Sequence, residues 1–371
     1  MTFIGVTGTN GKTTITSLLY KYYRFNNQNI TLIGTNGIYI NDNYYESINT
    51  TPGIEKLYDI ILKSYNLGIR TIVMEVSSHG IKQYRIHKIK FKVKALTNIT
   101  LDHLDYHKSF NEYKKVKLSF LKKSILLLNN DIDIIYNKKF KKVFTYGMKE
   151  SYFNMSEIKI NEQGSKFNLM IKNKQYLIET NLLGIFNCYN VLTFIGILYL
   201  LNEFDYLKIK QFLDSNIKIN GRMEVINYNN KNIIIDYAHT PDGIKNVLSF
   251  VKSINKRKII TLFGCGGNRD KSKRAVMGKI ASNYSDLIII TSDNPRDEEP
   301  EDIIDDIIQG VNTNYLKITD RKKAIKKGVE LLNEYDCLLI LGRGNESYTI
   351  IKNKKIEFND IEYVKEIING K

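Results

Sequence analysis

The chain has 371 residues, of which 43% are hydrophobic and 25% are charged, a balance that is typical of a globular protein large enough for two domains. No apolar run approaches the roughly 18 residues that a membrane-spanning helix needs, and the first residues lack the layout of a signal peptide. The three cysteines, Cys188, Cys265 and Cys337, lie far apart without metal-ligand spacing, so we expect a reduced, cytoplasmic protein.

The net charge of +16 admits two kinds of partner, because a basic surface attracts both nucleic acids and small anionic substrates. Lysine is scattered along the chain rather than gathered in one stripe, Ile, Tyr and Asn are abundant, and Trp is absent. This pattern is typical of compositional drift with lysine on solvated surfaces. We therefore expect small-molecule substrates, no nucleic acid, no membrane and a monomer.

Short apolar segments alternate with helix-like stretches in the first part of the chain. Strands are predicted at residues 3–6, 30–33, 71–76 and 93–98, and helices at residues 13–23 and 54–66. Such alternation predicts a parallel sheet with helices on both faces. Residues 151–179 differ, because polar and apolar side chains alternate there, and they predict a small antiparallel sheet.

A second series of strands begins beyond residue 220. Its candidates are residues 233–236, 258–263, 287–291 and 337–341. The sequence therefore predicts an α/β protein of two domains. Residues 1–220 form a domain with a mainly parallel sheet plus the small antiparallel one, and residues 221–371 form a Rossmann-like α/β domain.

Residues 5–14 read GVTGTNGKTT and lie between the first predicted strand and the first predicted helix. Glycines let the backbone curl so that its N–H groups face a phosphate, and the helix adds its positive N-terminal end. We expect Lys12 to reach the β- and γ-phosphates of ATP and the Thr13 hydroxyl to help hold Mg²⁺. The standard pattern has a glycine where this chain has Val6. A P-loop ATPase domain is therefore favoured, with a simple glycine turn as the alternative.

Acidic and imidazole side chains gather after two of the predicted strands. Glu75 lies at the carboxyl end of a strand, where ligands bind in α/β sheets, and it suits Mg²⁺ as well as it suits a helix cap. His79, His103 and His107 are three of the five histidines, and this clustering favours a site over isolated structural roles. Lys117 follows on a helix predicted to begin near residue 110, which would carry it back towards the same place.

Taken together, these motifs resemble the Mur ligase family, whose members join amino acids to the peptidoglycan precursor. The matching segments, in order, are GVTGTNGKTT, MEVSSH at 74–79, DHLDYH at 102–107, LGIFN at 183–187, GRME at 221–224, DYAHTP at 236–241 and FGCGGNRD at 263–270. The family's P-loop normally lacks the first glycine, so Val6 agrees with it. The resemblance covers nearly the whole chain and is strongest for the members that add the third residue of the stem peptide.

The resemblance implies roles for matching positions. The nucleotide contacts are Gly8, Thr9, Asn10, Gly11, Lys12, Thr13, Thr14, Asn187, Arg222 and Asp236. Two Mg²⁺ are expected, one held by Glu75 and Thr13 and a second by His103, bridged by Lys117 if that lysine is carbamylated. Carbamylation would turn a repelling ammonium into an anionic oxygen ligand. Lys12, Glu75, His103 and Lys117 are thus the implied catalytic residues.

The resemblance also implies where the substrates bind. The peptide end of the acyl acceptor is assigned to Thr50, Thr51, Ser78, Gln83 and Arg85, with Arg85 pairing with its carboxylate. Residues 293–296 read DNPR, which alone predicts only a turn with a capping aspartate. In the family this loop selects the amino acid, and here it resembles the version that accepts meso-diaminopimelate.

In that version Asn294 contacts the amino acid, and Arg296 can bind its distal carboxylate bidentately. Gly342 and Glu346 are assigned to the other end of the amino acid, and Arg274 is a weaker candidate. Residues 342–346 read GRGNE where the family usually has GKGHE, so the chain departs at two positions. The glycines and the acid are retained, so the expected substrate is unchanged.

The implied reaction is phosphoryl transfer from ATP to a carboxylate, followed by attack of an amine and release of ADP and phosphate, with domain closure assembling the site. Relatives of this type carry an N-terminal UDP-holding domain of roughly a hundred residues, whereas here the P-loop strand begins almost at Met1. We expect meso-diaminopimelate addition to UDP-MurNAc-L-Ala-D-Glu, with a separate polypeptide supplying UDP binding. The alternatives are a shortened relative that uses a smaller non-UDP carboxylate, such as a specialised peptide, and a non-catalytic nucleotide-binding subunit.

Overall fold

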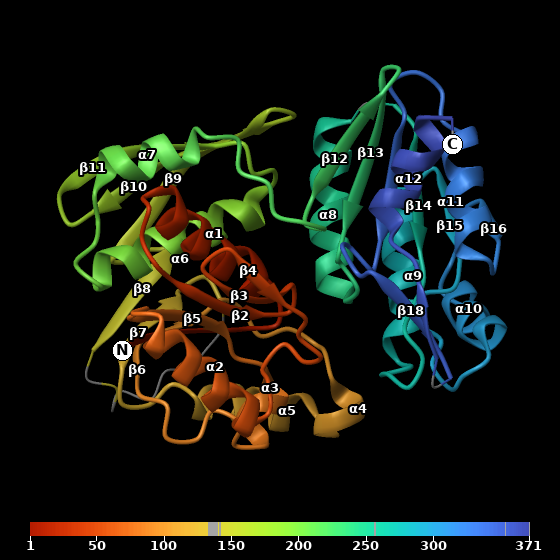
Figure 1. Ribbon diagram of the computed structural model, residues 1–371. Helices are drawn as coiled ribbons and strands as arrows, with labels where there is room; N and C mark the ends of the chain where they lie inside the picture. Colours follow the sequence, from red (N-terminus) through yellow and green to blue (C-terminus); the bar gives the residue numbers. More distant parts are fainter. Residues whose placement is uncertain (133–139, 141, 256, 353, 371) are drawn as a thin grey trace. The chain divides into compact units, whose positions relative to one another are not determined.

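The computed structural model describes residues 1–132, 140, 142–255, 257–352 and 354–370, which form two compact units (Figure 1). The first unit comprises Met1–Thr100 and Ser109–Ile217, and the second comprises Leu101–Lys108 and Lys218–Lys371. The sequence did not predict that Leu101–Lys108 groups with the second unit, although the chain on both sides of it belongs to the first. No helix in the described part of the chain has the length and apolarity needed to cross a bilayer.

The first unit is built on an 11-stranded sheet with the order β11-β10-β9-β8-β7-β6-β1-β5-β2-β3-β4. Its parallel centre consists of β8 (Val143–Gly147), β7 (Ile125–Asn129), β6 (Phe91–Leu96), β1 (Thr2–Thr7), β5 (Thr71–Glu75) and β2 (Thr31–Gly34). The strands β3 (Gly37–Ile40) and β4 (Asn43–Tyr45) extend one edge antiparallel. The apolar runs predicted as central strands are thus confirmed, because strands buried on both faces need such runs.

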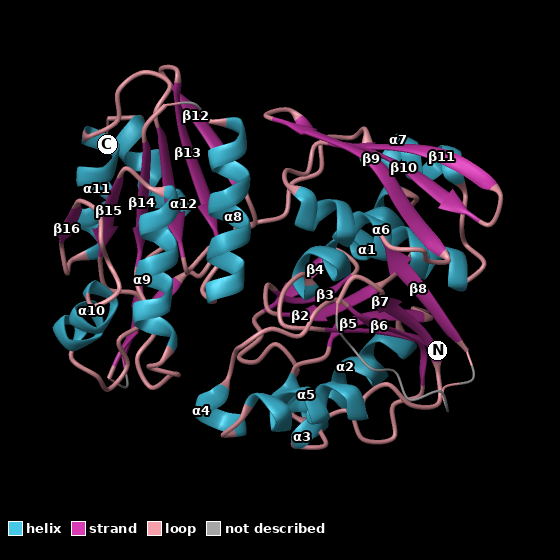
Figure 2. Cartoon of the chain, turned by 180° about the vertical axis from the view of Figure 1, so that it is seen from behind, coloured by secondary structure: helices cyan, strands magenta, loops and turns pink. Residues whose placement is uncertain are grey.

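The predicted antiparallel strands exist, but they continue the main sheet instead of forming a sheet of their own (Figure 2). They are β9 (Phe153–Asn161), β10 (Gly164–Ile171) and β11 (Lys174–Thr180). Parallel pairing of Tyr146 with Phe153 and of Gly147 with Asn154 joins β9 to β8. Local alternation along a strand shows which side chains are buried but not which neighbour completes the ladder, so the sequence left this junction undetermined.

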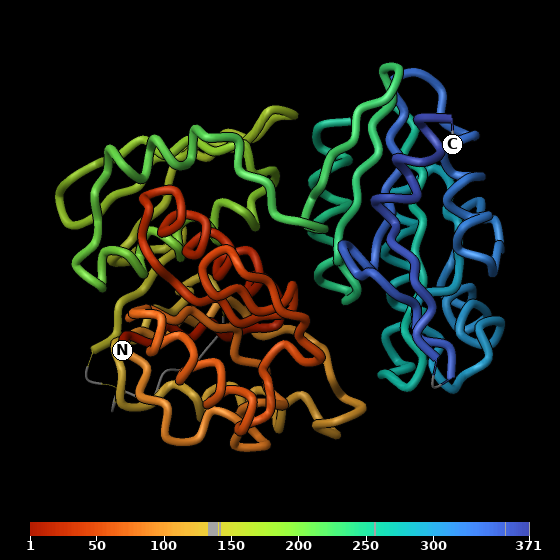
Figure 3. The backbone as a smooth tube through the Cα atoms, in the orientation of Figure 1, coloured from red at the N-terminus to blue at the C-terminus, as the bar shows by residue number. Residues whose placement is uncertain are grey.

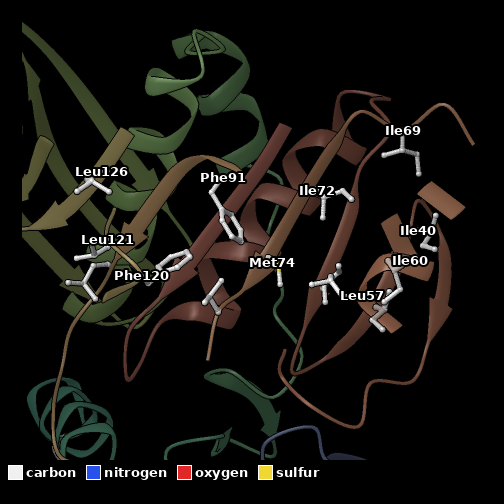
Figure 4. Close-up of a cluster of buried hydrophobic side chains, with 14 of the residues drawn as sticks. Ile40, Leu57, Ile60, Ile69, Ile72, Met74, Phe91, Phe120, Leu121 and Leu126 are labelled. Carbon is white, nitrogen blue, oxygen red and sulfur yellow. The ribbon is translucent and has the colours of Figure 1, made fainter. Parts of the chain in front are cut away.

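Helices cover both faces of this sheet (Figures 1 and 3). They are α1 (Lys12–Phe25), α2 (Ile54–Asn66), α3 (Ser78–Lys82), α5 (Phe110–Ser119), α6 (Ile185–Leu200) and α7 (Tyr206–Leu213). On the face covered by α2, the buried residues Ile72, Met74 and Phe91 meet Leu57 of α2 and Phe120 (Figure 4). Each such side chain contributes about 1.5–3 kcal/mol when it is fully buried, so this cluster holds the strand ends in place.

The second unit has a six-stranded sheet with the order β12-β13-β17-β14-β15-β16, parallel except for β12. Its strands are β12 (Glu224–Tyr228), β13 (Lys231–Asp236), β14 (Ile259–Phe263), β15 (Leu287–Ile290), β16 (Tyr315–Lys317) and β17 (Cys337–Leu341), beside the hairpin β18 (Tyr348–Ile351) and β19 (Lys354–Glu357). Its helices are α4 (Leu104–His107), α8 (Pro241–Ile254), α9 (Lys273–Tyr284), α10 (Pro300–Ile308), α11 (Arg321–Glu330) and α12 (Asp360–Ile368). The strands predicted for this unit are confirmed.

Two buried arginines share one carboxylate in the second unit. Arg321 of α11 donates to both oxygens of Asp360, at 2.9 and 2.7 Å, and also to the carbonyl of Leu341. Arg343 lies 3.9 Å from the same carboxylate and donates to the carbonyl of Phe358. All three charged side chains are buried, so this cluster ties the first residue of α12 to the end of β17 and the loop that follows.

We expect Asp360→Ala to destabilise the second unit by about 3–5 kcal/mol, because it leaves two guanidinium groups buried without their shared partner. Urea unfolding of the full chain measures the change. Glu362→Ala is the matched control, since Glu362 lies in the same helix and only makes an exposed pair with Lys365. Its effect should stay within about 1 kcal/mol. Equal and small changes in both variants would contradict a structural role for the cluster.

Candidate active site

The phosphate-binding loop occupies the short connection between β1 and α1. Gly11 precedes α1 with φ +87°, a conformation that side chains disfavour. A Cβ on Gly8 would lie 1.8 Å from Thr97 Oγ1, so only glycine fits there. The end of β6 braces the loop, because Asn98 Oδ1 accepts from the backbone N–H of Asn10 at 2.9 Å. The predicted loop is therefore present, with its curvature set by close packing against β6.

Two lysines converge on one carbonyl of this loop. Lys12 Nζ donates to the carbonyls of Gly8 and Thr9, both at 2.8 Å, and Lys117 Nζ donates to Gly8 at 2.9 Å. Lys117 is buried and lies 5.0 Å over the ring of Tyr113. Two ammonium groups beside a loop of this kind favour an anionic ligand such as a phosphate. A role for Lys117 in metal binding requires carbamylation and stays a prediction.

The carboxylate of Glu75 is the centre of a cluster of oxygen atoms. It is 1% exposed at the end of β5, and Thr13 Oγ1 donates to its Oε2 at 3.1 Å. Thr35, which was not predicted from the sequence, donates its backbone N–H to Oε1 at 2.9 Å and its hydroxyl to Oε2 at 3.1 Å. Carboxylate and hydroxyl oxygens are the hard donors that Mg²⁺ prefers, so these residues fit a magnesium ion that is also bound by phosphates. Thr14 is buried beside Thr13 at the start of α1.

The predicted acceptor-binding residues come together beside Glu75. Thr51 Oγ1 donates to the Glu75 carbonyl at 3.0 Å, and Arg85 Nη1 donates to the Thr51 carbonyl at 2.7 Å. Arg85 Nε also donates to Gln83 Oε1 at 2.8 Å. The buried hydroxyl of Ser78 has no hydrogen-bond partner among the described residues. Leaving such a group unpaired is costly, so Ser78 is suited to a polar group of a substrate.

Helix α6 brings two asparagines to the phosphate-binding loop. Asn187 donates to the carbonyl of Leu183 at 2.8 Å and accepts from Asn190 Nδ2 at 2.9 Å. A Cβ on Gly11 would lie 2.5 Å from Asn190 Oδ1, so Asn190 contacts the loop itself. Asn187 was predicted from the sequence, whereas Asn190 was not. Its position three residues further along a helix, on the same face, was the signal available.

The two nucleotide contacts predicted in the second unit, Arg222 and Asp236, lie shortly after Lys218, where the chain enters that unit. The guanidinium of Arg222 stacks 4.4 Å over the ring of Tyr237. Asp236 accepts from the backbone N–H groups of Met223 and Ala238, both at 2.8 Å, and burial raises the pKa of its carboxyl. Asp236 thus holds the turn at Met223, just after the chain enters the second unit. Nucleotide contact by Arg222 and Asp236 stays a prediction.

A carboxylate and an amide from two loops meet at the edge of the second sheet. Asn294 Nδ2 donates to Glu346 Oε2 at 2.8 Å, and the Tyr237 hydroxyl donates to Oε1 at 3.3 Å. Burial, with a smaller effect of the nearby Asp293, raises the pKa of Glu346 to about 7. Gly342, with φ +110°, begins the loop that carries Glu346. Asn294 and Glu346 therefore lie together, on the loops that follow β15 and β17. Binding of the amino acid by Asn294, Gly342 and Glu346 stays a prediction.

Two arginines flank Gly266 in the same unit. A Cβ on Gly266 would lie 2.7 Å from Arg296 Nη1 and 3.6 Å from Arg269 Cγ. Burial, reinforced by the charge of Arg269, lowers the pKa of Arg296. A pair of guanidinium groups attracts a carboxylate. Arg296 was predicted from the sequence, whereas Arg269 was not, although it lies within the family-like segment 263–270.

Arg274, predicted as a weaker substrate contact, has a different role in the structure. It is 1% exposed and donates to both oxygens of Glu298 at 3.0 Å and to Asp306 at 2.9 Å. These carboxylates occupy the guanidinium, so the geometry does not support substrate binding by Arg274. Because Glu298 follows Arg296 by two residues, Arg274 instead holds the loop that carries Arg296.

His103 lies in the segment Leu101–Lys108 of the second unit. Its Nε2 is 3.3 Å from Asp102 Oδ2, and Lys273 Nζ is 3.9 Å from Asp102 Oδ1. Burial acts to raise the pKa of Asp102, but these positive neighbours outweigh it and lower the pKa to about 2. Because His103 and Lys117 belong to different units, the second magnesium site stays a prediction.

Comparisons with known proteins bear on both units. Residues 6–198 match the Mur ligase middle domain, and residues 221–344 match the Mur ligase glutamate ligase domain. The UDP-N-acetylmuramoyl-L-alanyl-D-glutamate–2,6-diaminopimelate ligase of Aquifex aeolicus is 41% identical over 376 residues, which cover 99% of this chain and 77% of that protein.

Two solved structures extend the comparison. A UDP-N-acetylmuramoyl-L-alanyl-D-glutamate–2,6-diaminopimelate ligase is 30% identical with a TM-score of 0.68, covering 100% of this chain and 78% of that one. A MurF ligase from Thermotoga maritima in complex with ADP shares the fold, with a TM-score of 0.71 at 15% identity over 100% of this chain and 79% of that one. With the P-loop geometry and both matched domains, the chain belongs to the Mur ligase family of ATP-dependent acid–amino-acid ligases.

Proposed function

We propose that the protein adds meso-diaminopimelate to UDP-MurNAc-L-Ala-D-Glu in peptidoglycan synthesis. The observation that carries this proposal is the distribution of charge in the second unit. Arg296 and Arg269 flank Gly266, and Asn294 links the same loop to Glu346. Guanidinium groups at one place and a carboxylate at another match an amino acid that has an extra carboxylate at its far end. The names and identities of the relatives support the same substrate pair.

The residues of the first unit support activation of a carboxylate by ATP. Lys12 would orient the terminal phosphates, and Arg85 would pair with the carboxylate of the acyl acceptor. Glu75 and Thr13 would hold Mg²⁺, which neutralises charge on the transferred phosphoryl group. An oxygen of the acceptor carboxylate attacks the γ-phosphorus and ADP leaves, giving an acyl phosphate.

The residues of the second unit support the second half of the reaction. Glu346 would accept a hydrogen bond from the amino end of the incoming amino acid and orient its nitrogen. That nitrogen attacks the acyl carbon, loses a proton, and phosphate leaves as the amide forms. The Arg269–Arg296 pair would hold the distal carboxylate and so fix which end of the amino acid reacts.

Two other functions give different expectations. A relative that uses a smaller acceptor would not require the UDP group on that acceptor. This alternative arises because the chain matches 77% of the length of the Aquifex relative. A non-catalytic nucleotide-binding subunit has no physical need for both Glu75 and Thr13 beside the loop. The contact between them, at 3.1 Å, therefore favours an enzyme over a binding module.

Lys12→Ala should abolish ATP-dependent turnover while leaving the fold intact, because the half-buried ammonium donates to the loop, at the carbonyls of Gly8 and Thr9, and phosphate is its expected partner. ADP release measures turnover, and thermal unfolding measures the fold. The control is Lys21→Ala in the same helix, which should keep full activity. Full activity of Lys12→Ala would contradict the nucleotide assignment.

Purified protein should release ADP with meso-diaminopimelate and not with lysine, because an ammonium would face two guanidinium groups. The Arg296→Ala variant should raise the KM for meso-diaminopimelate by about a hundredfold, the size expected when a charged hydrogen bond is lost. Acceptors with and without UDP are compared in the same assay. Preference for lysine would overturn the assigned amino acid, and equal use of both acceptors would favour the smaller-acceptor function.

Glu346→Gln should bind meso-diaminopimelate weakly, and its stability relative to the wild type should rise between pH 5 and pH 8. The pKa of Glu346 is raised to about 7 from 4.5, so its contribution to stability is present below pH 4.5 and is lost as the pH rises through 7. The variant should gain of the order of 1–3 kcal/mol relative to the wild type between pH 5 and 8. Urea unfolding at both pH values tests this, and a constant difference between the proteins would contradict it.

A further inference from the structure

Thr35 reaches the active site through a tight hairpin. Gly34 at the end of β2 pairs with Gly37 at the start of β3, so Thr35 and Asn36 form the whole connection. Strand β2 runs parallel to β5, and β5 runs parallel to β1. The carboxyl ends of all three strands therefore meet at one edge, and the hairpin brings Thr35 to the same edge as Glu75 and the phosphate-binding loop.

The contacts of Thr35 connect two parts of the site. Its backbone N–H and hydroxyl both donate to the Glu75 carboxylate, at 2.9 and 3.1 Å. Its hydroxyl oxygen also lies 3.0 Å from Thr50 Oγ1. A Cβ on Gly34 would lie 2.3 Å from Glu75 Oε1, so glycine at this position lets the carboxylate lie against the hairpin. An unbroken series of hydrogen bonds thus runs from Thr13 through Glu75 and Thr35 to Thr50.

The number of protons sets the direction of this series. A threonine hydroxyl has one proton to donate and two lone pairs, whereas an ionised carboxylate only accepts. Because Thr35 gives its proton to Glu75, Thr50 must be the donor in its contact with Thr35. The Thr50 hydroxyl then offers only lone pairs to a ligand. A group that binds it must be a donor, such as the N–H of a peptide bond.

We propose that Thr35 is a positioning residue that holds Glu75 in place for Mg²⁺ and makes the Thr50 hydroxyl a hydrogen-bond acceptor for an amide N–H of the acyl acceptor. This inference rests on the proposed function and identifies the kind of acceptor group that this edge of the site selects. Thr35 acts on both substrates through its neighbours, so its loss affects the magnesium–nucleotide complex and the acceptor together. Thr50 faces the acceptor, so its loss affects the acceptor alone.

Isothermal titration calorimetry with Mg²⁺–ADP and with UDP-MurNAc-L-Ala-D-Glu tests this on the full chain. Thr35→Val keeps the shape of the side chain and removes the hydroxyl, and should weaken both ligands by about tenfold. Thr50→Val should weaken only the acceptor by a similar factor. The double variant should bind the acceptor no more weakly than either single variant, because the two hydroxyls act as one unit. An acceptor whose amide N–H is replaced by an ester oxygen should bind wild type and Thr50→Val equally.

Thr35→Ser, which keeps the hydroxyl, should restore both affinities. Thr31→Val is the matched control, since Thr31 lies on the same strand and its buried hydroxyl pairs with Ser64 away from the site. It should lower thermal stability without changing either affinity. If Thr35→Val fails to fold, the Thr50→Val variant still tests the inference. Acceptor affinity equal to that of the wild type in Thr50→Val would overturn it. Failure of the wild type to bind Mg²⁺–ADP or the acceptor would instead contradict the proposed function.

Discussion

The buried carboxylate of Glu75 is the constraint around which the first unit is arranged. A charge without water is tolerated only where donors surround it, and three donors from two segments do so here. Those segments are the start of α1 and the hairpin after β2, so both must end at the same edge of the sheet. The neighbouring order β1-β5-β2 meets that requirement. The same arrangement places the phosphate-binding loop close to Thr50 and Thr51, the residues proposed to bind the acceptor.

The second unit also contains a poorly solvated carboxylate. Glu346 is held by neutral partners, Asn294 and Tyr237, and burial raises its pKa to about 7. A carboxylate kept so weakly solvated is available to a ligand that brings a positive or donating group. Arg296 lies on the same loop as Asn294 and is held by a backbone carbonyl, since its guanidinium donates to the carbonyl of Gly267 at 2.8 Å. Within the described residues neither Glu346 nor Arg296 forms an ion pair, which agrees with the proposed recognition of a zwitterionic amino acid.

Helices and strands were predictable from the sequence where a hydrophobic pattern extends over many residues. Site residues were predictable where they belong to a long sequence motif. Helix α2 and strand β17 have the predicted bounds, because periodic or continuous apolar runs define them. Thr35 could not be found, because it is a single polar residue whose contact depends on how two distant segments pack. Asn190 could have been found, because it follows Asn187 by three residues on one face of a helix. Arg274 was a weaker candidate for substrate binding because the family resemblance implied that role. Only folding shows that Glu298 and Asp306 occupy it.

The position of Asp360 has a consequence for how the protein can be shortened. Asp360 is the first residue of the last helix, and it is the carboxylate shared by Arg321 and Arg343. Arg343 is the residue between Gly342 and Gly344, in the loop that carries Glu346. Truncation before residue 360 would thus remove the counter-charge of the loop that carries Glu346, whereas a tag added after the helix would leave it untouched. Helix α12 (Asp360–Ile368) is therefore a support for this loop and not an expendable tail.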